Sequence, residues 1–374
     1  MSKSVSMKVL GVLMAVLVAV SVLTGCGAQN STTTTTTTAA VTTTLAQSSN
    51  QETSAATTTT TATSTEMAKN PESEKFVLEY PEDMKELGFV DPLVLEKKPV
   101  RVVSLTVAPV PALMELGVKF VGLPTSRVVS WPEEMLKDTA LVKFNPHSPE
   151  DFDFESLVVL EPDLVIVSSG VKDTAGKKLV EEFNLPVYYV QGGHTVKYAS
   201  VKSQTAEFVK AFGKGDAAAK GEEIMKRFVD LEAKVEKSKA MFEGKSVMVI
   251  QSGGDRHFIQ TNGGTLGSML EMLGFVNVFE NKGNSMVQLD LEQALSYNPD
   301  FVVCVGGGTS EEHKAIMEKV FAENPDYWNS IAAIKDGKVQ YLGIDYIANT
   351  GIHVVGHIEK LVEYMTTLTG GRHE

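Results

Sequence analysis

The sequence predicts an α/β protein in which two similar lobes, each with a parallel sheet covered by helices, are joined by one long helix. Three observations predict this class. Short apolar strands alternate with helical segments through most of residues 98–365. One stretch of the chain occurs twice, and a single long segment of helical periodicity lies between the two copies. A duplicated unit with one interruption indicates two lobes and a connecting strut.

The repeated stretch covers residues 154–170 and again 291–307. Each copy predicts a short helix, ended by a proline that cannot continue it, and then a strand apolar on both faces. Ligands of such sheets bind beyond the carboxyl ends of the strands, which are residues 168–170 and 306–308 here. Three residue pairs keep one separation of 137 positions: Glu155 and Glu292, Pro162 and Pro299, and Asp163 and Asp300.

The first 26 residues, 1–26, predict an export signal with a lipid-attachment site. Residues 1–8 carry two lysines, and an apolar run of 15 residues follows, too short to span a bilayer comfortably. The run ends in Leu23-Thr24-Gly25-Cys26, which resembles the lipobox of bacterial lipoproteins. That resemblance implies cleavage before Cys26 and a diacylglyceryl group on its sulfur. The alternative is an ordinary signal peptide with an incidental cysteine.

Residues 27–70 predict a disordered tether between the anchor and the folded part. Residues 31–65 are about half threonine and carry one charge, Glu52. Such a composition cannot bury enough apolar surface to offset the entropy of ordering. A coil of this length spans on the order of 30 Å and also suits O-glycosylation.

Residues 71–196 predict the first lobe. A long, loop-rich crossing over 124–150 leads into the first copy of the repeat. The other expected elements are, in order, edge or hairpin segments at 76–78 and 94–95, strands at 101–105 and 120–123, a helix at 177–183 and a strand at 187–190.

Residues 197–243 predict the helix that joins the lobes. Ile224, Phe228, Leu231 and Val235 recur at helical spacing along one stripe. A helix from Asp216 to residue 242 would be about 40 Å long, which suits a rigid strut better than an ordinary crossover.

Residues 244–374 predict the second lobe, in which the α/β alternation restarts. Its expected elements are strands at 247–250, 276–279 and 339–342, helices at 265–273, from 310 and near 351–368, and the second copy of the repeat.

Composition excludes several function classes. The formal net charge of −13 argues against a nucleic-acid partner, which needs a basic surface. The only cysteines, Cys26 and Cys304, indicate no disulfide framework, and Cys304 falls within an apolar strand. The glycine runs at 262–265 and 306–308 lack the residues of a nucleotide fingerprint, although the first precedes a helix and suits an anion there.

The chain resembles the helical-backbone class of ABC-transporter substrate-binding proteins over about residues 98–365. The motifs that carry the resemblance are Pro99 to Leu105, Val121-Gly122, Glu155 through Pro162-Asp163, Gly264-Thr265-Leu266, Leu273-Gly274 with Asn277-Val278, and Pro299-Asp300. The resemblance implies two Rossmann-like lobes joined by a single long backbone helix, the class III periplasmic-binding-protein fold. It also implies a shallow cleft between them that closes little on binding.

That family binds iron–siderophore complexes, heme, cobalamin or, in a sister branch, bare metal ions. The resemblance therefore implies a lipid-anchored, extracytoplasmic binding protein, monomeric and without a cofactor of its own, which delivers a ferric siderophore or heme to an ABC permease and its ATPase. Cobalamin or a metal chelate is the alternative cargo. The bare-ion branch uses a histidine at the first loop, where this chain has Thr106 to Pro109.

Two glutamates match the family's docking positions. In the family, one glutamate on each lobe pairs with arginines of the permease, and the matching residues are Glu155 and Glu271. Charge pairing of this kind sets register and association rate more than affinity. The alternative for Glu155 is an acid favoured by the helix dipole in a first helical turn.

The ligand cleft is expected where loops follow the strands. Arginine forks suit carboxylate or hydroxamate oxygens, and aromatic rings suit a flat ligand. Each of these side chains can instead be an ordinary surface or packing residue. The candidates are Thr106, Arg127, Trp131, Ser169, His194, Arg256, His257, Met286 and Tyr346.

Histidines bear on whether the cargo contains a metal. His147, His194 and His257 fall in expected loops, while His353 and His357 lie four apart on the last helix and suit a helix face. His257, beside Arg256, is the candidate ligand for heme iron or another metal.

Two functions of other classes compete with a transport receptor. The first is a metal-cofactor enzyme on the same scaffold, which lacks support because the sequence shows no nucleophile–base motif, clustered cysteines or nucleotide fingerprint. The second is a surface sensor that binds the same cargo without transport. We therefore expect a binding protein and no enzyme.

Overall fold

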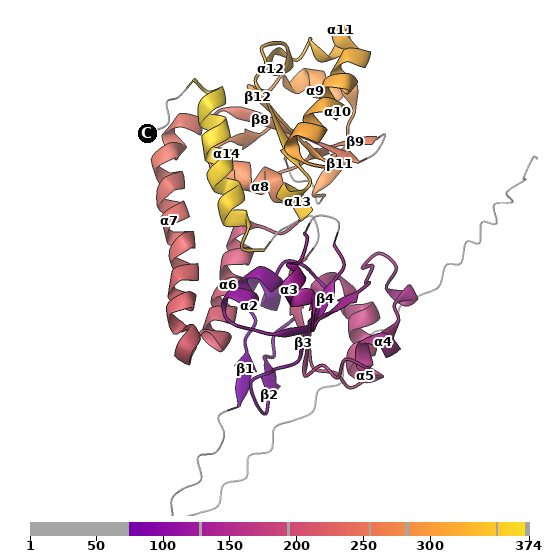
Figure 1. Ribbon diagram of the computed structural model, residues 1–374. Coiled ribbons are helices and arrows are strands. Elements are labelled where there is room, and N and C mark those ends of the chain that lie inside the picture. The colour runs from indigo at the N-terminus through magenta and orange to yellow at the C-terminus, as the bar shows by residue number, and fades with distance from the viewer. Residues whose placement is uncertain are drawn as a thin grey trace, which may run out of the picture. The chain divides into compact units, whose positions relative to one another are not determined.

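The computed structural model describes residues 75–126, 129–192, 195–253, 256–280, 284–348 and 351–370 (Figure 1). The predicted signal, Cys26 and nearly all of the predicted tether therefore lie outside the described residues. Residues 69–374 form one unit by their internal contacts. No helix among the described residues is long and apolar enough to cross a membrane.

The first lobe contains a five-stranded sheet of parallel strands in the order β5-β4-β3-β6-β7. A short antiparallel pair, β1 with β2, precedes it, as the sequence predicts. The strands are β1 (Phe76–Leu78), β2 (Leu93–Leu95), β3 (Val102–Ser104), β4 (Phe120–Pro124), β5 (Ala140–Val142), β6 (Leu164–Ser168) and β7 (Val187–Val190). The edge strand β5 lies within the loop-rich crossing predicted over 124–150, where the sequence analysis names no strand.

The helices of this lobe are short, with four to six residues each. They are α1 (Glu82–Glu86), α2 (Val110–Glu115), α3 (Glu133–Leu136), α4 (Phe154–Val158) and α5 (Lys177–Glu181), with irregular turns at Ser169–Val171 and Lys172–Gly176. Val103, Val165 and Val167 bury one face of the sheet against α4 and α5 residues such as Leu157 and Leu179.

Two helices follow the first lobe, α6 (Tyr198–Phe212) and α7 (Ala218–Phe242). The predicted stripe is real, since Ile224, Phe228 and Leu231 are fully buried and Val235 nearly so. α7 is about 38 Å long at 1.5 Å per residue. Its N-terminal half packs on α6, where the Tyr198 hydroxyl donates to the Phe228 carbonyl at 3.2 Å.

The C-terminal half of α7 belongs to the second lobe. It runs beside α14 (Val354–Leu368; Figure 1), and the Lys234 ammonium lies 3.0 Å from the Glu363 carboxylate. Phe242 stacks on Phe275 at the far end. One core cluster therefore includes one face of each sheet and the buried stripe of α7. The predicted strut is present.

The second lobe contains a six-stranded sheet that is only partly parallel. β8, β10, β11, β12 and β13 run in one direction, and β9 runs antiparallel to both of its neighbours. The order is β11-β9-β8-β12-β13, with β10 also paired to β8. The loop predicted at 253–258 is wrong, because β8 turns directly into β9 and pairs with it. The strands are β8 (Ser246–Gly253), β9 (Arg256–Gln260), β10 (Val276–Asn277), β11 (Met286–Gln288), β12 (Phe301–Gly306) and β13 (Val339–Gly343).

Helices cover both faces of this second sheet. Met317 and Trp328 pack on one face with Met248, Ile250 and Cys304, and α7, α8 and α14 cover the other. The remaining helices are α8 (Thr265–Met272), α9 (Leu291–Tyr297), α10 (Ser310–Glu323), α11 (Pro325–Trp328), α12 (Ala332–Lys335) and α13 (Asp345–Ala348).

The two copies of the repeat have the same local structure. Asp153 caps α4 by accepting from the Ser156 amide at 3.1 Å, and Asp290 caps α9 by accepting from the Gln293 amide at 2.9 Å. Each helix is followed by a left-handed residue before the proline, Glu161 with φ 44° and Asn298 with φ 35°. The duplicated sequence therefore folds as a duplicated helix, corner and strand.

Candidate functional site

The first lobe has a topological switch point between β3 and β6. From β3 the chain extends the sheet through β4 and β5, and it returns on the other side of β3 as β6 and β7. The loops after β3 and β6 therefore diverge, which opens the place where ligands of such sheets bind. Thr106 and Ser169, both half-buried, lie in these loops.

Hydrogen bonds and close packing fix these loops. The buried Ser104 hydroxyl donates to the Thr106 carbonyl at 2.6 Å and shapes the turn after β3. After β6, the Ser168 hydroxyl accepts from the Gly170 amide at 3.4 Å. Gly192 lies against it so closely that an added Cβ would be 2.3 Å from the Ser168 Oγ. This edge of the sheet is preorganised.

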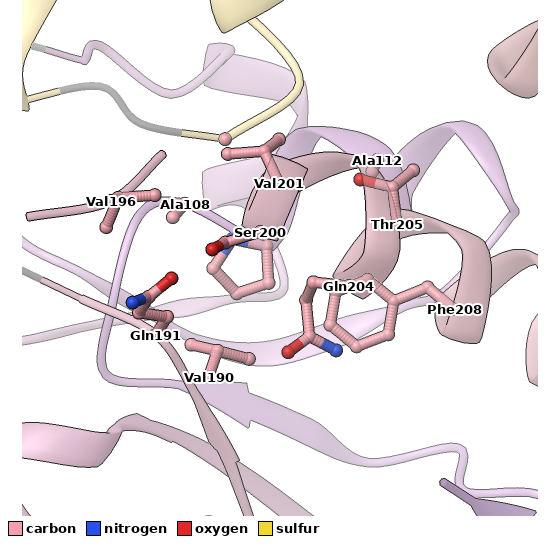
Figure 2. A pocket seen from close by; sticks show the side chains of 12 residues that line it. Ala108, Ala112, Val190, Gln191, Val196, Ser200, Val201, Gln204, Thr205 and Phe208 are labelled. Carbon is pink, nitrogen blue, oxygen red and sulfur yellow. The ribbon is translucent and has the colours of Figure 1, made fainter. Parts of the chain in front are cut away.

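A small cavity lies beneath this edge (Figure 2). Its volume of about 30 Å³ holds one or two water molecules. Ligand pockets for larger molecules are roughly tenfold larger. The buried Oε1 atoms of Gln191 and Gln204, which line it, have no hydrogen-bond partner among the described residues, so ordered water fits here and cargo does not. The two glutamines were not predicted from the sequence.

The cavity also marks where the chain beyond α13 meets the first lobe. Gly351 lines it together with Ala108 and Pro109 from the loop after β3. A Cβ on Gly351 would be 1.9 Å from the Ala108 carbonyl oxygen, so only glycine permits this approach. The predicted ligand loop at 106–109 is therefore in direct backbone contact with the segment that leads into α14.

The second lobe has its own switch point, between β8 and β12. Ser252 and Gly306 lie at the carboxyl ends of these neighbouring strands. β9 and β11 continue the sheet beyond β8, while β13 lies beyond β12. The hairpin places Arg256 and His257 on β9, directly opposite Gly253 and Ser252 of β8.

His257 is the predicted site residue with the clearest chemistry. Its Nδ1 lies 3.0 Å from the Ser252 hydroxyl, which orients the ring. Burial lowers the pKa of His257, so the imidazole is neutral near pH 7 and has a nitrogen lone pair available. A half-buried, neutral, oriented imidazole can coordinate a metal.

The other predicted residues of this lobe differ in exposure. Arg256 is exposed at the start of β9, and Met286 is half-buried at the start of β11, paired with Gln260. Tyr346 is only 4% exposed and stacks on His357 with ring centroids 4.4 Å apart, a core packing position. His357 in turn lies 3.3 Å from the Asp345 carboxylate.

Trp131 has a structural partner as well as partial exposure. Its indole Nε1 donates to the Pro124 carbonyl at 2.8 Å, and its ring packs against the main core cluster. Arg127, His194 and the predicted lipidation residue Cys26 lie outside the described residues.

A side chain of the protein itself occupies the predicted anion site at the start of α8. The Oε1 atom of Gln260 accepts from the amides of Leu266 and Gly267 at 3.1 and 3.3 Å. The Gly263-Gly264 turn therefore holds a glutamine side chain.

Both predicted docking glutamates are exposed. Glu155 lies on α4 in the first lobe and Glu271 on α8 in the second. Neither makes a salt bridge within the described residues. Their carboxylates are available to a partner.

A buried histidine was missed because the sequence reading considered loop histidines and the last helix. His313 lies one turn before Met317 on α10, and both are fully buried. Burial and the nearby His257 lower the pKa of His313. Within the described ranges, no three His, Cys, Asp or Glu side chains gather as a metal site.

Residues 102–346 match the family model described as periplasmic binding protein. One curated relative is the high-affinity heme uptake system protein IsdE of Staphylococcus aureus strain MRSA252. It is 24% identical over 241 residues, which cover 64% of this chain and 77% of the relative.

Two solved structures illustrate the likeness in three dimensions. The crystal structure of S. aureus IsdE complexed with heme matches with a TM-score of 0.57 and 21% identity, over 72% of this chain and 98% of that one. The periplasmic catecholate-siderophore binding protein VctP from Vibrio cholerae matches with a TM-score of 0.55 and 20% identity, over 79% of this chain and all of that one. These matches confirm the predicted class III architecture of two α/β lobes joined by a long helix.

Proposed function

The chain belongs to the periplasmic binding protein family, and from that premise we propose that it is the substrate-binding component of an ABC importer for an iron complex. It captures a ferric siderophore or heme between its lobes and delivers it to a permease and a cytoplasmic ATPase. The protein binds and releases its cargo without changing it.

The observation that carries this proposal is the pair of switch points. Each lobe presents loops at the carboxyl edge of its sheet, where ligands of such folds bind. The relatives support an iron complex as cargo, because one is a heme uptake protein and another binds catecholate siderophores.

His257 favours heme over a siderophore. A siderophore already surrounds its iron with oxygen ligands, whereas heme iron has open axial positions that an imidazole can take. The Ser252 contact at Nδ1 leaves Nε2 of His257 as the nitrogen for iron. Arg256, exposed on the same strand, suits a heme propionate or another carboxylate.

The N-terminal sequence supports a site of action outside the cell membrane. We propose that acylated Cys26 anchors the protein in the membrane and that residues 27–70 tether the lobes to it. Two or more acyl chains give stable anchoring. The lobes then sample cargo near the permease.

Titration of the purified chain tests the cargo. Hemin, ferric hydroxamates, ferric catecholates, cyanocobalamin and divalent zinc or manganese would each be added while Trp fluorescence is recorded. We expect saturable binding of one iron complex at one equivalent. Trp131 is the reporter near the ligand loops, and buried Trp328 is the internal reference. Saturation by cobalamin or a bare ion alone would replace the iron proposal, and no binding would end it.

For heme, His257→Ala tests the axial ligand. We expect a shifted Soret band and at least a tenfold weaker affinity, because one coordination bond is lost. His147→Ala, which removes an exposed histidine from the first lobe, is the matched control. An unchanged Soret band in His257→Ala would rule out His257 as the axial ligand of heme iron. The titration alone would then identify the cargo.

A further inference from the structure

An imidazole and a thioether, two kinds of side chain that can bind a metal ion, lie around Ser252 in the second lobe. The Ser252 Oγ lies 3.0 Å from the His257 Nδ1 and also 3.0 Å from the Met317 sulfur. These distances place an imidazole and a thioether around one hydroxyl at the carboxyl end of β8.

His313 adds a second imidazole to the cluster. A Cβ on Gly306 would be 2.8 Å from the His313 Nδ1 and 3.0 Å from the Ser252 carbonyl oxygen. The His313 ring therefore covers Gly306 beside Ser252. Met317 follows one helical turn later on the same buried face of α10, since residues four apart are neighbours on a helix.

The His313 ring is fully buried, yet neither of its nitrogens has a hydrogen-bond partner among the described residues. An unpaired buried polar group costs about 1–3 kcal/mol. Proteins keep such groups mainly where a ligand, water or function uses them. A thioether neighbour is a poor hydrogen-bond acceptor but a good ligand for a soft metal ion.

We propose that His313 and Met317 bind one soft monovalent cation of the Cu(I) or Ag(I) class, with the His257 imidazole beside them as a third donor. Imidazole and thioether are ligands that such ions accept, and hard cations such as Mg²⁺ or Ca²⁺ prefer oxygen. Because burial disfavours protonation of both histidines, their lone pairs are available near pH 7. His257 is also the proposed heme ligand, whereas His313 and Met317 have no part in the proposed transport of an iron complex.

Silver titration of the full chain tests the site. Cys304, buried on β12 in the same core cluster as Met317, is a competing thiol. The parent protein for the test therefore carries Cys304→Ala and Cys26→Ser. Isothermal titration with Ag(I) in chloride-free buffer should show one saturable equivalent. Long-range ¹H–¹⁵N spectra should show the His313 ring nitrogens shifting as silver is added.

Two variants and two matched controls decide the outcome. Met317→Leu keeps the packing volume and should weaken silver binding at least tenfold, as should His313→Leu. Met241→Leu and His147→Leu remove a methionine and a histidine from exposed positions and should bind like the parent. If His313→Leu fails to fold, Met317→Leu alone decides. No saturable equivalent in the parent, or variants that bind like their controls, would overturn the proposal.

Discussion

At the scale of single residues, the duplicated aspartates explain why the repeat is so visible in the sequence. Asp163 accepts from the Val100 and Arg101 amides, both at 2.8 Å, just before β3. Asp300 accepts from the Ser246 amide and hydroxyl, both at 2.8 Å, at the start of β8. Each aspartate thus fixes the register between its own strand and the neighbouring first strand of the lobe.

Asp300→Asn should lower the free energy of unfolding by about 1 kcal/mol at neutral pH, since a charged acceptor is replaced by a neutral one. The Ser246 amide holds the pKa of Asp300 below its ordinary value of 3.8. The stabilisation is therefore complete above that value and is lost as pH falls through the folded-state pKa. Urea unfolding at pH 7 and pH 3 measures the difference, which should shrink at pH 3. The exposed Asp91→Asn is the control, and an equal loss in both variants would contradict the role of Asp300.

Prediction succeeded for residues whose structure depends on their neighbours in the sequence. It failed for residues whose structure depends on tertiary contacts. The proline corners and the acids beside them follow from backbone chemistry, which the sequence contains. The core position of Tyr346 depends on His357 of α14, and the burial of His313 depends on Gly306 of β12 and on β8, which lies much earlier in the chain. Spacing within one segment carries no information about such neighbours.

At the scale of elements, α7 is predictable because its apolar stripe repeats over several turns. Phe228 lies at the centre of this stripe, packed on Tyr198 of α6. Leu231 and Val235 continue the stripe toward the second lobe, where α14 covers it. The periodic signal extends over four apolar residues, from 224 to 235, so its detection does not depend on any one of them.

Phe228→Ala should cost about 3–5 kcal/mol of unfolding free energy, because it leaves a cavity in a fully buried site. The adjacent Val229→Ala, at a side chain that is 57% exposed, should change stability by less than about 0.5 kcal/mol. Chemical denaturation of both variants provides the comparison. Equal losses would mean that the stripe does not hold the helix in place.

The short second-lobe strands were harder to predict than α7. The predicted loop at 253–258 contains two glycines, yet Gly254-Asp255 between two strand-like segments is also a hairpin signal. To decide between a loop and a hairpin, one must know which strand pairs with residues 256–260, and β8 lies beside them only in the folded sheet. The same is true of β5, a three-residue edge strand that depends on β4.

At the scale of the whole molecule, the proposed transport requires a partner that recognises both lobes. Exposed Glu155 and Glu271 lie in different lobes, on helices that each lobe's own sheet supports, and neither carboxylate forms a salt bridge with the residues that the structure describes. Two separated charges define an orientation, which a single charge cannot do. Family resemblance supplied these positions, whereas the geometry shows only that they are accessible.

Replacing both glutamates by alanine should leave cargo binding unchanged and reduce uptake at least tenfold in cells that carry the cognate permease. Fluorescence titration measures binding, and accumulation of labelled iron measures uptake. Glu292→Ala is the matched control, since Glu292 is the repeat counterpart of Glu155 and is equally exposed. Full uptake by the double variant would mean that docking uses other contacts.

The contact between Gly351 and Ala108 limits how such a molecule can respond to its cargo. The backbone of Gly351 packs directly against the Ala108 carbonyl there, and a glycine has no side chain that could move aside. The two segments therefore cannot approach each other further at this spot, so any inward movement of the lobes must occur elsewhere or must first separate this contact. A change in the angle between the lobes would alter the fit of these two backbone segments before it altered any side-chain contact at this spot.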